Sequence, residues 1–179
     1  MPDEKLIFQP VIEAMFVAGL KDRMTDPFRA RLKVLGIAVE KIRPAYPYEI
    51  WENALLEAVT LFPELQKGEA LEELGRRLVS ATIDAHPVGK TLLPMLRVLG
   101  ISRAIKRTLK NGASENFNVA TFGAETSTSL VVHMSDVGRI PEYAMGTLAG
   151  LAGHVGAKNV RATIESYTPP TATYLLEWS

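Results

Sequence analysis

The stretch NFNVATFGAETSTSLVVHM, residues 116–134, is where the chain changes the periodicity of its apolar residues. Apolar and polar residues alternate over positions 116–122, and the Gly-Ala-Glu segment at 123–125 is typical of a turn. Residues 127–134 then contain a Leu-Val-Val run that fits a second strand. Because a period of two places apolar side chains on one face of a strand, we expect a β-hairpin over residues 116–134.

Downstream of this hairpin, residues 141–156 follow a helical pattern. Their apolar positions are Tyr143, Leu148, Leu151 and Val155. Gly146 and Gly150 are four residues apart, so on a helix they share a face, and we expect the sheet or another helix to approach that face closely. Two segments rich in β-branched and aromatic residues, Val160–Ser166 and Thr173–Trp178, are predicted to be strands. The last third of the chain is therefore expected to form a β-β-α-β-β unit.

Upstream of the hairpin, apolar residues recur at three- and four-residue steps and are punctuated by Pro and Gly. The segments expected to be helical are Pro10–Leu20, Asp26–Leu35, Pro47–Phe62, Glu69–Ala85, Gly89–Leu99 and Ser102–Lys110. Residues 37–47 are expected to be extended, because each proline disfavours the helical region for the residue before it. The first two-thirds of the chain are thus predicted to be a helical block.

Together these elements predict an α+β fold in which an N-terminal helical block packs on a C-terminal unit with a four-stranded antiparallel sheet. One thin helix cannot cover both faces of such a sheet, so we expect the N-terminal helices to supply the rest of the core. Residues 1–179 are then one domain with a helical half, residues 1–112, and a β-β-α-β-β half, residues 113–179.

The composition is that of a folded globular protein. Of 179 residues, 47% are hydrophobic and 22% are charged, which excludes disordered and low-complexity classes. Twenty Lys and Arg balance twenty Asp and Glu, so no overall field draws the chain to nucleic acid or to an anionic membrane. The chain has no Cys, which excludes disulfides, thiolate metal sites and a thiol nucleophile.

No targeting signal is apparent at the N-terminus. The chain begins with acidic as well as basic residues, and the apolar stretch Leu6–Leu20 is interrupted by Gln9, Pro10 and Glu13. The other apolar runs are shorter than the roughly 18 residues needed to span a bilayer. We therefore expect a cytoplasmic protein without membrane insertion.

Motifs that carry catalytic, nucleotide or metal chemistry are weak in this sequence. Gly89-Lys90-Thr91 resembles the end of a phosphate-binding loop, but Asp84 stands where that loop has its first glycine. The three histidines, His86, His133 and His154, lack the spacing of metal ligands. No serine nucleophile elbow occurs either. We therefore expect neither catalysis nor a bound metal.

One basic stretch stands out between Arg97 and Lys110. It contains Arg97, Arg103, Lys106, Arg107 and Lys110. Such a stripe can contact phosphate or an acidic partner, but aromatic residues for base stacking are not interleaved with it. A solvated helix face is the favoured interpretation, and we expect no nucleic-acid partner.

An ordered set of landmarks along nearly the whole chain resembles a known family. The landmarks are Phe8-x-Pro10, Tyr46-Pro47 with Trp51, Leu74-Gly75-Arg76, Gly89, Pro141-x-Tyr143-x-x-Gly146, Gly156 and Tyr174-x-x-x-Trp178. With them the chain resembles the large myxobacterial paralogous family of uncharacterised proteins of about this length, the domain-of-unknown-function 2378 family.

The order of elements is more loosely similar to a superfamily of vinyl-reductase-like domains, transport-particle subunits and haem nitric-oxide-binding domains. This resemblance implies a small apolar ligand, an acyl chain or haem between helices and sheet, or a dimeric assembly scaffold. The haem branch has an axial His on a helix and a Tyr-x-Ser-x-Arg motif, and this motif is missing here. The acylated or metal-binding Cys of the other branches is missing too, so we expect no cofactor.

Two hypotheses for function remain. The first is a regulatory module that binds a small apolar ligand or a protein partner. Its expected ligand-binding residues are Trp51, Phe117, Tyr143, Met145 and Gly146. The alternative is a purely structural homodimeric adaptor in which the same residues only fill the core.

A homodimer is expected under both hypotheses, through the first helix. Val11, Met15 and Leu20 lie on an apolar stripe that Val17 widens beyond the roughly 100° required for a one-sided core contact. Either the other helices of the chain or a second copy of the chain must cover the additional apolar surface of this helix. We expect Val11, Met15, Val17 and Leu20 to form the dimer interface.

Overall fold

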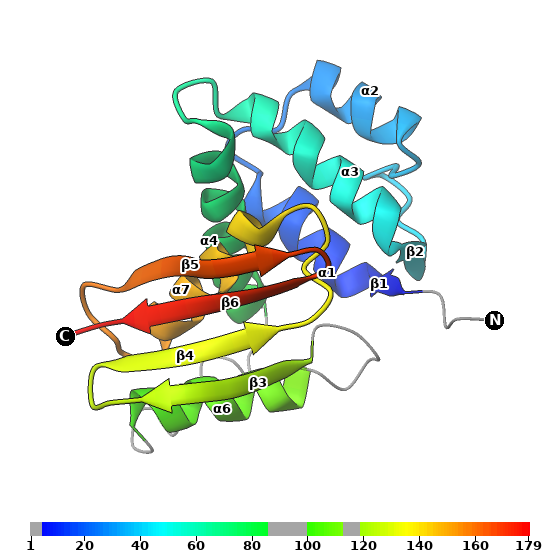
Figure 1. The fold of residues 1–179 in the computed structure, drawn as a ribbon. Coiled ribbons are helices and arrows are strands. Elements are labelled where there is room, and N and C mark those ends of the chain that lie inside the picture. The colour runs from blue at the N-terminus through cyan, green and yellow to red at the C-terminus, as the bar shows by residue number, and fades with distance from the viewer. Residues whose placement is uncertain (1–4, 86–99, 113–118) are drawn as a thin grey trace.

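A computed structural model gives the structure of the chain, and it describes residues 5–85, 100–112 and 119–179. Several features singled out in the sequence lie outside these ranges. They are the expected helix Gly89–Leu99, the Gly89-Lys90-Thr91 motif, His86, Arg97 and Phe117. The described residues form an α+β fold, in which a group of helices lies beside a four-stranded antiparallel sheet (Figure 1).

The C-terminal sheet has the expected four strands. They are β3 (Ala120–Glu125), β4 (Ser129–Met134), β5 (Arg161–Thr168) and β6 (Thr171–Glu177). Their spatial order is β3-β4-β6-β5, and each neighbouring pair is antiparallel. The predicted hairpin is therefore correct, and the chain end inserts its last strand beside β4.

The turn of the hairpin lies later than expected. Gly123 belongs to β3, and the chain turns where the Thr126 N–H donates to the Ser129 carbonyl at 3.0 Å. The two hydroxyl oxygens of these residues are 2.7 Å apart. A register shift between Phe122 and Glu125 lets β3 run on past the glycine. The turn is therefore formed by the Thr-Ser-Thr-Ser stretch, residues 126–129, and not by the Gly-Ala-Glu segment at which the sequence predicted it.

The described helices cover only one face of this sheet. In Figure 1 the sheet faces the viewer, and α7 (Pro141–His154) and α6 (Ile101–Gly112) lie behind it. No helix of the described ranges lies in front, so the expectation that helices cover both faces is wrong there. The outer face needs no cover, because residues such as His133 and Thr173 alternate with buried ones along β4 and β6.

Helix α6 packs with the C-terminal sheet rather than with the N-terminal helices. Ala104 and Ile105 are fully buried and join the cluster of the sheet and α7. Lys106 forms an ion pair with Glu125 of β3, and its ammonium lies 5.6 Å from the Phe122 ring centroid. The helix that ends the predicted helical half is therefore part of the second core.

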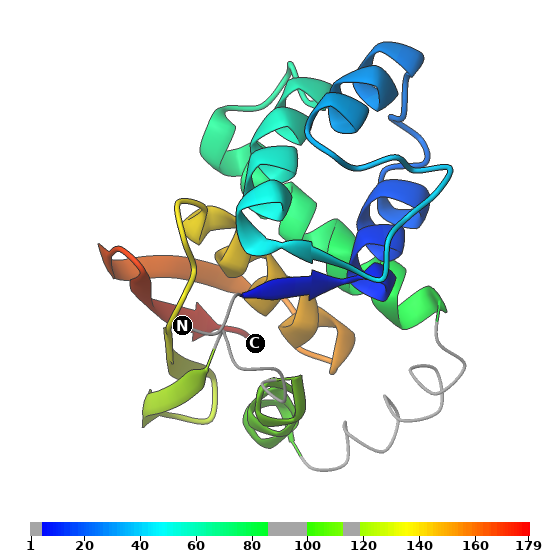
Figure 2. The same cartoon turned by 90° about the vertical axis from the view of Figure 1, so that its right-hand side faces the viewer.

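The helical half contains more elements than the sequence indicated. In chain order they are β1 (Leu6–Phe8), α1 (Gln9–Glu13), η1 (Ala14–Gly19), α2 (Asp26–Val34), β2 (Ala45–Pro47), α3 (Tyr48–Ala58), η2 (Val59–Leu61) and α4 (Lys67–Ala85). Strands β1 and β2 form a small antiparallel sheet in which Ile7 pairs with Tyr46. Figure 2 shows this small sheet between the helices and the large sheet.

The first predicted helix, Pro10–Leu20, divides into α1 and a π-helical segment, η1. The Leu20 N–H donates to the carbonyl of Met15, five residues back, at 2.9 Å. This wider turn keeps Met15, Phe16 and Leu20 buried while it leaves Val17 exposed.

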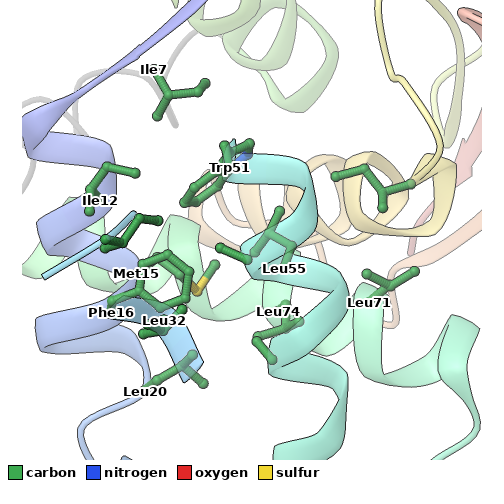
Figure 3. Close-up of a cluster of buried hydrophobic side chains, with 14 of the residues drawn as sticks. Ile7, Ile12, Met15, Phe16, Leu20, Leu32, Trp51, Leu55, Leu71 and Leu74 are labelled. Carbon is green, nitrogen blue, oxygen red and sulfur yellow. The ribbon is translucent and has the colours of Figure 1, made fainter. Parts of the chain in front are cut away.

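Side chains of the first helix and α3 meet in the N-terminal core (Figure 3). Trp51 is 2% exposed, and its ring stacks edge-on against Phe16, with the ring centroids 5.8 Å apart. Such edge-to-face aromatic pairs add to the stabilisation from burial alone. Trp51 is thereby fixed at the boundary between the helical half and α7.

The two halves meet where α4 crosses α7, and glycines make this crossing close. A Cβ atom on Gly146 would lie 1.9 Å from the Glu72 carbonyl oxygen, and one on Gly75 would lie 2.2 Å from the Tyr143 carbonyl oxygen. On Gly150 it would lie 3.3 Å from the Arg76 Cα atom. The predicted close approach at Gly146 and Gly150 is therefore confirmed, and its partner is α4.

Candidate functional site: a cavity between the two halves

A cavity of about 200 Å³ lies between the helical half and the sheet half. From the helical half it is lined by Ile7, Val11, Tyr48, Trp51 and Leu78. From the other half it is lined by Met134, Val137, Tyr143, Ala144 and Thr147. Each half thus contributes one wall, and most of the lining is apolar.

Helical spacing explains why these side chains line the same cavity. Tyr48 and Trp51 are three residues apart at the start of α3, and Tyr143 and Thr147 are four residues apart on α7. Gly146 lies between the last two residues in the sequence and allows α7 to approach α4. The close crossing therefore sets the distance between the wall that carries Leu78 and the wall that carries Tyr143.

Two aromatic rings make the boundary of the cavity rigid. The Trp51 and Tyr143 ring centroids are 5.9 Å apart, and the ring planes are nearly perpendicular. Because Trp51 also packs edge-on against Phe16, three aromatic rings form a chain from the N-terminal core to α7. A ligand in the cavity would therefore meet surfaces that are held in place before it binds.

The Tyr143 hydroxyl is the notable polar group of this cavity. Within the described residues it makes no hydrogen bond, whereas the Tyr174 hydroxyl donates to the Pro141 carbonyl at 2.9 Å and Thr147 donates to the Ala144 carbonyl at 2.7 Å. Burial raises the pKa of Tyr143 well above its usual value of 10.0, and the nearby Tyr48 adds to the rise. Tyr143 is therefore a neutral phenol, and its hydroxyl can donate a hydrogen bond to a ligand.

Tyr48 is also held neutral. Burial raises its pKa well above 10.0, and the charges of Glu52 and Asp136 raise it further. The cavity thus offers two phenols, one threonine and apolar surface, and none of its described lining residues carries a charge.

The structure brings together two of the five expected ligand-binding residues, Trp51 and Tyr143, in the cavity wall. Gly146 lies beside the cavity, in the contact of α7 with α4. Met145 packs with the cluster of the sheet, and Phe117 lies outside the described ranges.

Sequence reasoning missed most of the other lining residues. Thr147 and Tyr48 share a helix face with Tyr143 and Trp51, and that spacing could have found them. Val137 carries no such signal, because it lies in a loop whose position depends on contacts with α3.

Two of the expected dimer residues are not available to a second copy. Met15 and Leu20 are fully buried in the core of their own chain, because α4 packs across η1. Val11 lines the cavity and is half-buried. Val17 is 49% exposed and lines a surface groove with Val39 and Ile42. The expected interface is therefore corrected at Met15 and Leu20.

The two described histidines lie apart from the cavity and from each other. His133 is on the outer face of the sheet, where its Nδ1 atom is 2.9 Å from the Thr173 hydroxyl. The His154 Nδ1 atom is 2.9 Å from the Gly150 carbonyl oxygen. Within the described ranges, no group of three His, Cys, Asp or Glu residues could hold a metal ion. The helices of these ranges include none that is long and apolar enough to cross a membrane.

Solved structures of H-NOX domains share the fold of this chain. The H-NOX domain of Shewanella oneidensis in its Fe(II)CO ligation state is 11% identical, with a TM-score of 0.67, and the match covers 97% of this chain and 99% of that one. An oxygen-binding H-NOX domain related to soluble guanylate cyclases, in its oxygen complex, is 8% identical, with a TM-score of 0.66 and coverage of 96% and 95%. A structure that probes the function of haem distortion in the H-NOX family is 7% identical, with a TM-score of 0.69 and coverage of 97% and 95%.

These identities are low, so the likeness concerns the fold, which extends over nearly the whole of each chain. Among curated proteins, none matches this chain significantly. The sequence profile of one family, described as "Protein of unknown function (DUF2378)", matches residues 5–179. The landmarks noted in the sequence, from Phe8-x-Pro10 to Trp178, fall within this match. The chain belongs to the DUF2378 family.

Proposed function

We propose that this protein is a non-catalytic regulatory module that binds a small, largely apolar ligand in the cavity between its two halves. The observation that carries this proposal is the cavity itself, a largely apolar space between the two halves with the hydroxyls of Tyr48, Tyr143 and Thr147 among its lining residues. Pockets that are mostly apolar and carry a few convergent polar groups are the usual sites for small molecules.

The size of the cavity limits the ligand. A dry apolar cavity of about 150 Å³ can hold benzene, whereas pockets for drug-sized molecules begin at about 300 Å³. The cavity here has about 200 Å³. It therefore fits a dissolved gas or an organic molecule with about one ring.

The chemistry of the wall adds one requirement. A hydrogen bond between neutral groups contributes about 0.5–1.5 kcal/mol net. A ligand that places a carbonyl, ether or similar acceptor against the Tyr143 hydroxyl gains this contribution, and the rest of the ligand contacts Trp51, Leu78 and other apolar groups. We infer that the ligand is a small apolar molecule with one hydrogen-bond acceptor.

The likeness to H-NOX domains supports a sensor role. One of these similar structures is an oxygen-binding domain in its oxygen complex, and another carries Fe(II)CO. The match extends over nearly the whole chain, so the comparison supports a small ligand for this fold. It is consistent with the cavity found here.

Haem itself does not fit the described residues. The cavity is smaller than a site for a drug-sized ligand, and haem is larger than most such ligands. Its described lining contains no His or Cys to serve as an axial ligand. We therefore propose direct binding of the small molecule by protein side chains.

A regulatory role follows from the position of the cavity. The helical half and the sheet half each supply five lining residues, so an occupant contacts both. A ligand that prefers one arrangement of the two halves shifts the population towards it. A protein partner that binds across both halves would then respond to occupancy.

Calorimetric titration with two probes of similar size tests this function. Toluene offers only apolar surface, and benzaldehyde adds a carbonyl acceptor. We expect the wild type to bind both, and Tyr143→Phe to lose about two- to tenfold in affinity for benzaldehyde only. Ala144→Leu fills the cavity and should abolish both. If neither probe binds, or if Ala144→Leu leaves binding unchanged, the proposed function is wrong.

We further propose that the module acts as a homodimer through the exposed side of its first helix. Val17 is 49% exposed and lines a groove of mixed apolar and charged residues together with Val39 and Ile42, so it can still contact a second copy. A dimer that binds neither toluene nor benzaldehyde would favour the alternative, a structural homodimeric adaptor without a ligand.

A further inference from the structure

A surface groove begins next to the cavity. It has a volume of about 800 Å³ and runs beside α1 and η1, with Val17, Val39 and Ile42 among its lining residues. Val11 of α1 lines this groove and also lines the cavity. Among the described lining residues, no other belongs to both hollows. The Val11 side chain therefore lies between the cavity and the groove.

The cavity and the groove lie end to end along α4. Leu78 lines the cavity, and Thr82, four residues later on the same helix, lines the groove. Residues four apart share a helix face and are separated by a rise of about 6 Å along the helix axis. This distance is close to the width of one side chain, so a single residue is enough to fill the interval. On the wall formed by α1, that residue is Val11.

Val11 separates the two hollows with few atoms. Its side chain packs against the N-terminal core but is only half-buried, whereas Ile12 and Met15 of the same helical segment are fully buried. Beyond its Cβ atom, valine has only two methyl groups. A shorter side chain at position 11 would therefore join the cavity to the groove and leave the fully buried contacts of Ile12 and Met15 in place.

The groove offers apolar surface to a molecule that extends past Val11. Three of its other lining residues, Pro10, Ala14 and Val17, are apolar and come from the same helical segment as Val11. The cavity alone has about 200 Å³, and the groove is several times larger. An alkyl chain that passed position 11 would therefore find both room and apolar contacts.

We propose that Val11 is the residue that limits the size of the ligand. Its two methyl groups end the cavity on the side of the groove and confine the ligand of the proposed function, on which this inference rests, to about one ring. A longer chain on the ligand stays in water in the native protein. When the side chain at position 11 is shortened, such a chain enters the groove and adds to the affinity.

Alkyl phenyl ketones measure this limit, because they combine one ring and one hydrogen-bond acceptor with a chain of adjustable length. Acetophenone is close in size to benzaldehyde, and hexanophenone is the same ketone with a chain longer by four methylenes. Calorimetric titration gives the ratio of the two affinities in the wild type, in Val11→Ala and in Val137→Ala. Val137 is the matched control, because the same two methyl groups are removed from a residue that lines the cavity but not the groove.

We expect the wild type to bind hexanophenone no more tightly than acetophenone, because the extra methylenes gain no apolar contact. A methylene that moves from water to apolar surroundings tightens binding by up to about fourfold, so the ratio of hexanophenone to acetophenone affinity should rise by about tenfold or more in Val11→Ala. In Val137→Ala, and in Val11→Thr, which keeps the branched shape, the ratio should stay at the wild-type value. An unchanged ratio in Val11→Ala, or an equal rise in Val137→Ala, would overturn this role of Val11.

A measurement without ligand separates this inference from the proposed function. Trp51 lines the cavity and is 2% exposed, and Trp178→Phe leaves it as the only indole of the chain. In this background, acrylamide, a small neutral quencher, should quench Trp51 fluorescence faster in Val11→Ala than in Val137→Ala, because it can approach from the groove. Faster quenching with no ketone bound to the wild type supports the role of Val11 and refutes the proposed function. Acetophenone binding with unchanged quenching and an unchanged affinity ratio in Val11→Ala has the opposite meaning.

Discussion

Replacing Gly146 by Ala tests the close crossing of α4 and α7, on which the shape of the cavity depends. The added Cβ atom would lie 1.9 Å from the Glu72 carbonyl oxygen and within 2.8 Å of two further backbone atoms of the same residue. Because backbone atoms in the middle of a helix cannot rotate away, α7 must move from α4 by roughly 1 Å or more.

Two opposing effects set the size of the loss. Overpacking a core usually costs about 1–3 kcal/mol, and a contact with rigid backbone belongs at the upper end or beyond. Ala in place of Gly gains up to about 1 kcal/mol in helix propensity. We therefore expect Gly146→Ala to lower the free energy of unfolding by about 2 kcal/mol or more, which corresponds to roughly 4–8 °C in melting temperature for a chain of this length.

Urea denaturation gives this free energy, and Gly153→Ala is the matched control. Gly153 lies in the last turn of the same helix, and a Cβ atom there would meet nothing within 4 Å. The control should be as stable as the wild type or up to about 1 kcal/mol more stable. A Gly146→Ala variant as stable as Gly153→Ala would refute the close crossing and, with it, the way in which α7 positions Tyr143 and Thr147.

Three further predictions concern the tyrosines and the first helix. Tyr143→Phe should leave the free energy of unfolding unchanged or raise it, because the Tyr143 hydroxyl has no partner within the described residues. Tyr174→Phe should lower the free energy of unfolding by about 0.5–1.5 kcal/mol, because it loses the 2.9 Å hydrogen bond to the Pro141 carbonyl. Equal losses for the two variants in urea denaturation would contradict this prediction. Above pH 10 the free energy of unfolding should fall as the pH rises, because Tyr48, Tyr143 and Tyr174 have raised pKa values and stay neutral in the folded chain while they ionise in the unfolded chain. Tyr143→Phe should reduce the slope of the free energy of unfolding against pH by up to about 1.4 kcal/mol per pH unit. An unchanged slope would contradict the raised pKa of Tyr143. Val17→Glu should convert a dimer to a monomer in light scattering, and a monomeric wild type at micromolar concentration would exclude the dimer.

The sequence was sufficient to predict the elements in which a pattern of apolar residues repeats over many positions. The four strands, α7 and the close contact at Gly146 were predicted, because each depends on a repeated pattern or on a pair of glycines four residues apart. Strands β1 and β2 were not predicted, since each has only three residues and carries no alternation. The π-helical turn at 14–19 also has no pattern of its own, and it is stabilised by burial of Met15 and Phe16.

The candidate site was predicted less completely than the fold. Trp51 and Tyr143 were found because aromatic residues near a thin helix suggest a pocket, but the cavity itself depends on how two distant segments pack. The ion pair between Glu52 of α3 and Arg139, which precedes α7, shows the difference most clearly. Glu52 and Arg139 are 87 residues apart, and one is charged and buried only because the other reaches it. No local pattern can indicate such a pair.

Crystals exposed to xenon under pressure test the central claim most directly, because xenon enters small apolar cavities without any specific chemistry. The account predicts a xenon atom between Trp51, Leu78 and Tyr143 in the wild type, and its loss in Ala144→Leu. Xenon bound at other places on the protein, with none in this cavity, would contradict the claim that this cavity receives a small ligand.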